Sequence, residues 1–362
     1  MTLLFTVIIV ALIFEYINGF HDTANSIATV VSTKVLTPRM AIAMAAVTNL
    51  WGALVGSAVA KSITSGLVNA EFVTTETIVC ALLAGIIWNL LTWWFGIPSS
   101  STHALVGGLA GATLAGAHGN WGAIIWAEAG KNHWWEGKGI LLKVIIPMIT
   151  SPLVGFGVGL IFMTFLYALV KNWRPGLVAS VFGKAQLISA GYMGFSHGTN
   201  DAQKTMGIIA LTLAAAAKAG TLTGIPGWLD FLNHPMMKDA AGKESIHVWI
   251  KVLCAIVMCA GTAAGGWRII HTMGHKMVKL QPIHGFAAET TAATVLMAAG
   301  HFGMPVSTTH AITTSIMGVG CAKRFSALKL GVIERIIWAW ILTLPLTALV
   351  GYALMELVNL TH

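Results

Sequence analysis

The chain has 362 residues, of which 56% are hydrophobic and 9% charged, with 21 Lys and Arg against 13 Asp and Glu. A soluble domain carries about 25% charged residues, because water has to solvate its surface. So few charges cannot cover a particle of 38.2 kDa, and the mean hydropathy of +0.78 agrees. The composition excludes a soluble enzyme and a disordered chain. It predicts an all-α polytopic membrane protein, in which a net charge of +8 indicates basic loops rather than a nucleic-acid partner.

Apolar runs near the length of about 20 residues that crosses a bilayer follow one another along the chain. They cover 3–18, 40–60, 74–96, 140–170, 184–217, 247–272, 284–303 and 331–358. Two shorter runs, 104–117 and 311–321, each follow a polar hexapeptide, PSSSTH (98–103) or PVSTTH (305–310). We expect these to form re-entrant helical hairpins at 97–117 and 304–321, since non-helical backbone at membrane depth has to line a cavity or be buried. The total is about 10–12 helical segments.

The arginines indicate how the chain is oriented. All five lie in four connecting segments, 32–39, 171–184, 268–284 and 322–335. Because cytoplasmic loops are enriched in Lys and Arg, these segments are expected inside and both termini outside. The expected location is the cell (inner) membrane, as a multi-pass protein.

Two further polar segments, GFHDTAN (19–25) and GFSHGTND (194–201), interrupt apolar runs upstream of the two hexapeptides. A polar segment followed by a hexapeptide therefore occurs twice. This predicts two repeats, 1–170 and 184–358, with a polar insertion at 218–247 on the outside. The first repeat would begin outside and the second inside. Such an inverted repeat is typical of secondary transporters, whose substrate binds near the midplane.

These four motifs together resemble the inorganic phosphate transporter (PiT) family, in particular its compact bacterial members. The second polar segment extends the likeness as GFSHGTNDAQK, and the resemblance covers both halves of the chain. It implies cation-coupled symport of inorganic phosphate by alternating access, with no enzymatic activity and no cofactor beyond co-transported H+ or Na+. Glu289 matches an acid of the family, whereas Asn49 stands where many members carry a further acid.

The candidate coupling residues lie in the two polar segments. A charged side chain in an apolar run costs about 2.5–3.5 kcal/mol, so Asp22 and Asp201 need a purpose or a partner. They occupy matching places in the two repeats and have carboxamides beside them, which favours a small cation held in irregular backbone. The predicted coupling residues are Asp22, Asn25, Asn200, Asp201 and Glu289, and no metal site is assigned.

The hexapeptides are the candidate phosphate site. Each opens a half-helix, whose free N–H groups and positive dipole end attract an anion. The alternative is that their hydroxyls only cap those helices. The predicted phosphate-binding residues are Ser100, Ser101, Thr102, Ser307, Thr308, Thr309, Gln203 and Lys204.

Four histidines lie in or beside the motifs. His103 and His310 end the hexapeptides, and His21 and His197 lie beside the aspartates. Histidine changes its charge near neutral pH, so these residues are candidate proton carriers. The alternative is that they fix the geometry of the hairpins.

Lys204 favours proton coupling, because sodium-coupled relatives resemble the first repeat here, where Asn25 stands three residues after Asp22. Sodium coupling and transport of sulfate or another tetrahedral oxyanion remain alternatives on the same fold. An anion channel is a different class and would need no buried acids. The sequence leaves open the stoichiometry, whether phosphate travels as a metal-phosphate complex, and whether the chain forms a homodimer in the lipid bilayer.

Overall fold

The computed structural model describes residues 1–55, 58–130, 133, 136–238, 244–322, 324 and 328–361, which are mainly helical. Its α-helices are α1 (Thr2–Ser32), α2 (Pro38–Leu54), α3 (Ala58–Ser65), α4 (Thr75–Phe95), α5 (Ser101–Gly116), α6 (Ile146–Val170), α7 (Pro175–Lys218), α8 (Val248–Ala264), α9 (Trp267–His271), α10 (Pro282–His301), α11 (Thr308–Cys321) and α12 (Leu330–Asn359). The shorter elements are η1 (Trp121–Ala123), η3 (Leu141–Ile145), η4 (Gly227–Asn233), η5 (Thr272–Lys276) and a hairpin of β1 (Met236–Lys238) with β2 (Glu244–Ile246).

Several of these helices are long and apolar enough to cross a membrane. By length and composition, the described residues contain four such helices, Thr2–Ser32, Thr75–Phe95, Leu141–Val170 and Leu330–Asn359. Two bent pairs raise the number to six: Pro38–Leu54 with Ala58–Thr64, and Val248–Ala264 with Trp267–Gly274. The chain is therefore a helical membrane protein, as its composition predicts.

The apolar runs 40–60 and 247–272 are not single helices, which differs from the prediction. Each consists of two helices, and the bends between them are 67° and 60°. At the second bend Gly265 has φ +74°, a conformation that glycine adopts without steric cost. Within the insertion 218–247, η4 and the β-hairpin follow α7, while residues 239–243 lie outside the described part.

The expectation of irregular backbone around the two aspartates is wrong. Residues 19–25 lie inside the continuous helix α1, and 194–201 lie inside α7. Their backbone groups are bonded within the helix, so only the side chains need partners. Those partners come from other helices, and hydrophobicity along one segment cannot reveal them.

The apolar core consists of two clusters, and the polar segments around Asp22 and Asp201 lie between them. One cluster contains the start of α1, including Leu4 and Phe14, with residues of α3, α4, α5 and α8. The other contains the end of α1, including Ile27 and Val30, with residues of α2, α6, α10 and α11. Asp22 lies between the two clusters along α1.

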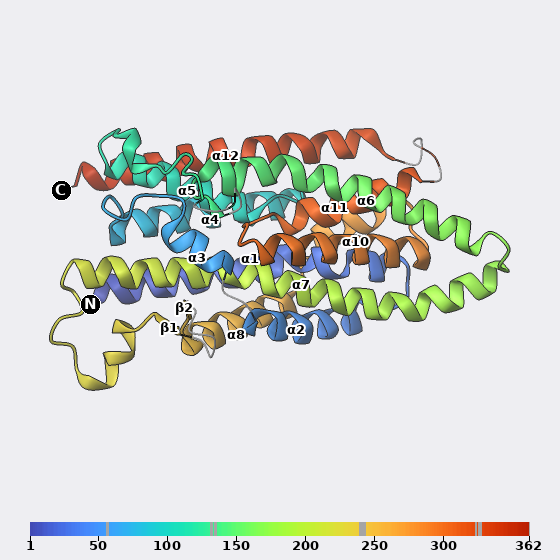
Figure 1. Ribbon diagram of the computed structural model, residues 1–362, viewed down its shortest axis with the longest axis horizontal. Coiled ribbons are helices and arrows are strands. Elements are labelled where there is room, and N and C mark those ends of the chain that lie inside the picture. Colours follow the sequence, from blue (N-terminus) through green and yellow to red (C-terminus); the bar gives the residue numbers. More distant parts are fainter. Residues whose placement is uncertain are drawn as a thin grey trace.

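The helices pair across the two halves of the chain. Helix α2 packs on α7 and α8 on α1, while α5 packs on α12 and α11 on α6. Figure 1 shows α4 and α5 in the part of the molecule near both chain ends, and α10 and α11 in the opposite part. Both termini lie at the same end of the molecule (Figure 1).

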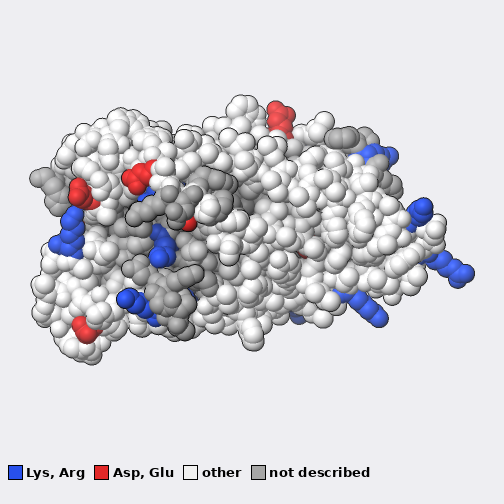
Figure 2. Space-filling model, in the orientation of Figure 1, with Lys and Arg blue, Asp and Glu red and all other residues white. Residues whose placement is uncertain are grey.

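Charged side chains differ between the two ends of the molecule. On the face in Figure 2, the tip where α6 joins α7 shows Lys and Arg only. The opposite end, near the termini, shows side chains of both signs (Figure 2).

Glycine allows the cross-half helix pairs to approach closely. A Cβ at Gly111 of α5 would overlap the carbonyl oxygen of Ala348 in α12. A Cβ at Gly318 of α11 would overlap the carbonyl oxygen of Phe156 in α6. Small residues at such contacts let van der Waals packing hold membrane helices together.

We expect Gly111→Ala to destabilise the protein, because the added methyl group pushes α5 away from α12. Overpacking of this kind costs about 1–3 kcal/mol. The measurement is the melting temperature of the purified variant in detergent. Gly157→Ala in α6 is the control, because nothing lies within 4 Å of a Cβ there. Equal melting temperatures for the two variants would show that the contact is not tight.

Candidate functional site

The two aspartates lie in the middle of α1 and α7, which pack against each other. Their exposed fractions are 2% for Asp22 and 0% for Asp201. The first residues of α5 and α11, Ser101 and Thr308, reach them from the two hexapeptides. The predicted motifs of both halves therefore meet at one buried place.

A chain of polar contacts connects the two carboxylates. The Lys204 ammonium lies 3.0 Å from Asp201 Oδ2 and donates to Ser101 Oγ at 2.8 Å. The Ser101 hydroxyl in turn donates to Asp22 Oδ2 at 2.7 Å. Lys204 is itself buried, at 1% exposure, so its charge is balanced inside the protein rather than by water.

The second hexapeptide completes the cluster. The Thr308 hydroxyl lies 3.4 Å from Asp201 Oδ2, and the Thr309 hydroxyl 3.4 Å from Asp22 Oδ1. The Asn25 amide donates to both threonine oxygens, at 3.1 and 2.9 Å. Asp22 thus contacts hydroxyls from both halves of the chain, whereas the hydroxyl that contacts Asp201 comes from its own half.

One serine in each hexapeptide is a helix cap. Ser100 accepts a hydrogen bond from the His103 N–H at 3.1 Å, and Ser307 accepts one from the His310 N–H at 3.2 Å. The structure therefore divides the predicted phosphate-binding hydroxyls into caps and residues that face the carboxylates. Thr102 is buried in the first turn of α5, beside Ser101.

The four histidines fall into two pairs. His21 lies 2.8 Å from Asp22 Oδ1, and His197 Nε2 lies 3.3 Å from Asp201 Oδ2. His103 and His310 instead pack edge to face on each other, with ring centroids 4.9 Å apart. The second pair brings the two hexapeptides together and contacts neither aspartate directly.

The cluster contains atoms that could hold a cation, and it has a deficit of positive charge. One ligand atom each of Asp22, His197 and Asp201 lie within 4.8 Å of one another. With both aspartates ionised and Lys204 protonated, two negative charges face one positive charge. A single proton or monovalent cation would therefore neutralise these three groups. Two unit charges 4 Å apart repel or attract by about 4 kcal/mol at an effective dielectric constant of 20, so the deficit opposes binding of an anion.

Two predicted site residues, Gln203 and Asn200, lie outside the cluster. Gln203 Oε1 accepts from the N–H groups of Val59 and Ala60, at 2.8 and 3.2 Å, and so caps α3. The Asn200 amide donates to the carbonyls of Ser196 and Leu296. The structure gives both side chains a role in holding neighbouring helices.

Glu289 lies on α10, also away from the aspartates. It accepts hydrogen bonds from Thr29 at 2.6 Å, Gln186 at 3.0 Å and Ser189 at 2.5 Å. Thr29 is seven residues beyond Asp22, which is about 10 Å along a helix. The role of Glu289 in coupling remains a prediction.

Two polar residues near the site, Thr92 and Glu15, are not among the predicted site residues. Thr92 of α4 accepts from Ser99 at 2.9 Å and lies 3.0 Å from His21 Nε2. Threonine in a helix usually bonds to its own backbone, so a lone Thr in an apolar run carries no distinct signal. The fully buried Glu15 accepts a hydrogen bond from Thr205 of α7. The charge of Glu15 within an apolar run was the sequence feature that could have indicated a buried polar contact.

The fold defines a helical membrane protein with a buried cluster of polar and charged side chains between its helices. The family model described as "Phosphate transporter family" matches residues 18–177 and 171–351. A "Probable low-affinity inorganic phosphate transporter" of Mycobacterium bovis is 40% identical over 96% of this chain and 76% of its own length. A protein of the same name from Bacillus subtilis is 40% identical over 95% of this chain and 94% of its own.

The chain therefore belongs to the phosphate transporter family, as its motifs predict. A solved structure named "The sodium-dependent phosphate transporter" is similar over 100% of both chains, with a TM-score of 0.77 and 24% identity. This similarity supports the fold of the chain.

We expect Ser101→Ala to lower phosphate affinity and Ser100→Ala to lower stability. Ser101→Ala removes the hydroxyl between Lys204 and Asp22, so it should weaken phosphate binding about tenfold or more, since a hydrogen bond to a charged group is worth about 1.5–3 kcal/mol. Ser100→Ala removes a cap, so it should cost about 0.5–2 kcal/mol of stability and leave affinity unchanged. Binding of labelled phosphate and melting temperature, measured on both variants, test this. A loss of affinity only in Ser100→Ala would reverse the assignment.

Proposed function

We propose that the protein is a secondary active symporter of inorganic phosphate, coupled to a proton gradient and working by alternating access. The observation that carries the proposal is the buried connection between Asp201, Lys204, Ser101 and Asp22. An anion can bind beside two carboxylates only when positive charge offsets their repulsion. Binding of the anion then depends on binding of the cation, and this dependence is what couples the two fluxes.

Phosphate is favoured as the substrate by the donors and acceptors at the site. Ser101, Thr308 and Thr309 supply hydroxyls beside the N-terminal turns of α5 and α11, where free N–H groups favour an anion. Monoprotonated phosphate also carries an O–H donor, which a carboxylate such as Asp22 can accept. Sulfate lacks that donor. Family membership and the names of the relatives support the same choice.

Lys204 favours a proton as the coupling ion. Its ammonium lies 3.0 Å from Asp201, where a second metal ion would otherwise compensate the carboxylate. An ammonium has three donors and no acceptor, so it can also donate directly to phosphate. Sodium coupling is the alternative, supported by the name of the structurally similar sodium-dependent transporter.

Phosphate uptake into proteoliposomes, under separately imposed proton and sodium gradients, tests the proposal. We expect labelled phosphate to accumulate in sodium-free buffer when a proton gradient is imposed. Lys204→Asn should lower this proton-driven uptake at least about tenfold, since it removes a buried charge that contacts Ser101.

Lys184→Asn, which changes a lysine of α7 far from the cluster along the helix, is the matched control and should transport normally. Uptake that requires sodium and ignores the proton gradient would contradict proton coupling. A phosphate flux that needs neither gradient and does not saturate would contradict symport altogether and favour a channel.

The pairing of helices supports the proposed inverted repeat. The contact of α2 with α7 has its counterpart in α8 with α1, and α5 with α12 has its counterpart in α11 with α6. The positions of α4–α5 and α10–α11 in opposite parts of the molecule agree with two hairpins that enter from opposite sides (Figure 1). Both termini lie at the end of the molecule that shows charges of both signs, opposite the tip that shows Lys and Arg only (Figures 1 and 2). This agrees with an orientation in which both termini are outside.

Two matching hydrogen bonds hold the hexapeptide loops closed. The Ser62 hydroxyl of α3 donates to the Gly303 carbonyl at 2.6 Å, and the Thr272 hydroxyl of η5 donates to the Gly96 carbonyl at 2.8 Å. Both glycines have positive φ, +61° and +64°, at equivalent places before the hexapeptides. We infer that each contact closes the site toward one of two opposite sides. Both contacts are formed here, which agrees with the burial of the site residues.

Breaking one of the two contacts should open one side only. We expect Ser62→Ala to raise the thiol reactivity of Met304→Cys, next to Gly303, and Thr272→Ala to raise that of Ile97→Cys, next to Gly96. Losing one neutral hydrogen bond of about 0.5–1.5 kcal/mol should change the open population about two- to tenfold. The measurement is labelling by a membrane-impermeant reagent from each side, in a background without the four native cysteines. If each variant changes both reporters equally, the two contacts do not act on separate sides.

A further inference from the structure

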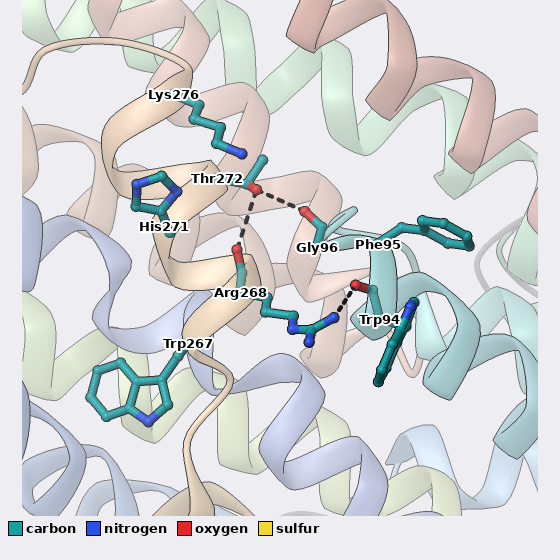
Figure 3. Close-up of a pocket in the computed structure, with 8 residues that line it drawn as sticks. All are labelled: Trp94, Phe95, Gly96, Trp267, Arg268, His271, Thr272 and Lys276. Atoms are coloured by element: carbon teal, nitrogen blue, oxygen red, sulfur yellow. Dashed lines mark hydrogen bonds between the residues drawn. The ribbon is translucent and has the colours of Figure 1, made fainter.

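A basic cavity lies at the surface of the helix bundle, beside the loop that leads into the first hexapeptide. It has a volume of about 420 Å³ and lies between the end of α4 and the segment formed by α9 and η5. A smaller adjoining cavity of about 80 Å³ shares Phe95, Gly96, Thr272 and Lys276 and adds Arg335 of α12. Figure 3 shows Arg268, His271 and Lys276 around the larger cavity, opposite Trp94 and Phe95.

Arg268, Lys276 and Arg335 form no ion pair with a carboxylate of the described residues. Within the described residues, no Asp or Glu oxygen lies within 4.0 Å of Arg268, Lys276 or Arg335. The positive charges of these three residues, which line two adjoining cavities, repel one another. An anion in the cavity would remove that repulsion.

Arg268 lies in helix α9 rather than in a loop, and its guanidinium is held in place. It lies over the rings of Trp93 and Trp94, 5.2 and 4.4 Å from their centroids, and Nη1 donates to the Trp94 carbonyl at 2.5 Å. A guanidinium has five N–H donors, so further donors are available for a ligand. Figure 3 shows the guanidinium between the Trp94 side and the Thr272 side of the cavity.

The side chains that surround these cations are apolar and face outward. Trp94 is 61% exposed, Phe95 66% and Trp267 47%. In a helical membrane protein, such a surface is covered by lipid rather than water. Basic pockets between membrane helices with an apolar surround bind the head groups of acidic lipids. Free inorganic phosphate would use the cations but not the aromatic surface.

We propose that this cavity binds the phosphate group of an anionic phospholipid. The phosphate diester accepts hydrogen bonds from Arg268 and Lys276, and an acyl chain lies along Trp94 and Phe95. Arg335 stabilises the negative charge from α12 across the adjoining cavity. This lipid site does not depend on the proposed transport cycle.

Lipid binding to the purified, delipidated protein tests the proposal, by native mass spectrometry with dioleoyl phosphatidylglycerol and dioleoyl phosphatidylcholine as probes. We expect the anionic lipid to bind more tightly than the zwitterionic one. Lys276→Gln and Arg335→Gln should each weaken phosphatidylglycerol binding, and together by about tenfold or more. Arg174→Gln, an exposed arginine at the start of α7, is the matched control and should bind normally.

A second arm separates lipid from free phosphate. Inorganic phosphate at millimolar concentration should leave phosphatidylglycerol bound, because it lacks the acyl chains that contact the aromatic side chains. Displacement of the lipid by inorganic phosphate would overturn the lipid assignment in favour of a free phosphate site. Equal binding to the wild type and the Lys276→Gln/Arg335→Gln variant would overturn the site itself. Each variant is first checked for an unchanged melting temperature in the absence of added lipid, so a folding defect is not read as lost binding.

Discussion

Two carboxylates that share one ammonium inside the protein are the constraint on which the rest of the structure depends. Burying Asp22 and Asp201 without compensation would cost several kcal/mol each, even on the most lenient insertion scales. Lys204 compensates one of them, and Ser101 extends the contact to the other. Because these residues come from three helices in both halves of the chain, the cluster fixes how α1, α5 and α7 are placed relative to one another.

The polar cluster also explains why α1 and α7 remain continuous helices. A break would expose backbone N–H and C=O groups in a region where two apolar cores meet, and each would need a partner. In an intact helix, only the polar side chains need hydrogen-bond partners from other helices. The hexapeptides carry the irregular backbone instead, and there Ser100 and Ser307 bond the free N–H groups. The remaining hydroxyls are then free to face the carboxylates.

The sequence predicts the parts of the site that repeat, and it misses the parts that depend on tertiary contacts. Asp22, Asp201 and the hexapeptides were chosen as candidates because charges and hydroxyls in apolar runs are costly and occur twice, and the structure brings them together. Lys204 was found because it breaks the repeat. Gln203 was also predicted to bind phosphate; its side-chain oxygen caps α3, whose N-terminus comes close only in the fold, and its binding role stays a prediction. Hydrophobicity located the membrane helices but not the bends in 40–60 and 247–272, because a bend changes no residue's polarity.

The exchange of helices between the two halves has a consequence for how the chain is made. Helix α5 packs on α12, which leaves the ribosome more than 200 residues after α5, and α6 packs on α11. During synthesis the glycine-lined face of α5 therefore meets lipid, or a helper protein, until the C-terminal helix has been inserted. Neither of the two proposed repeats therefore buries its helix faces without the other. A chain truncated before α12 would therefore expose this face of α5 to lipid and to membrane proteases, even if the rest of its first half is correctly folded.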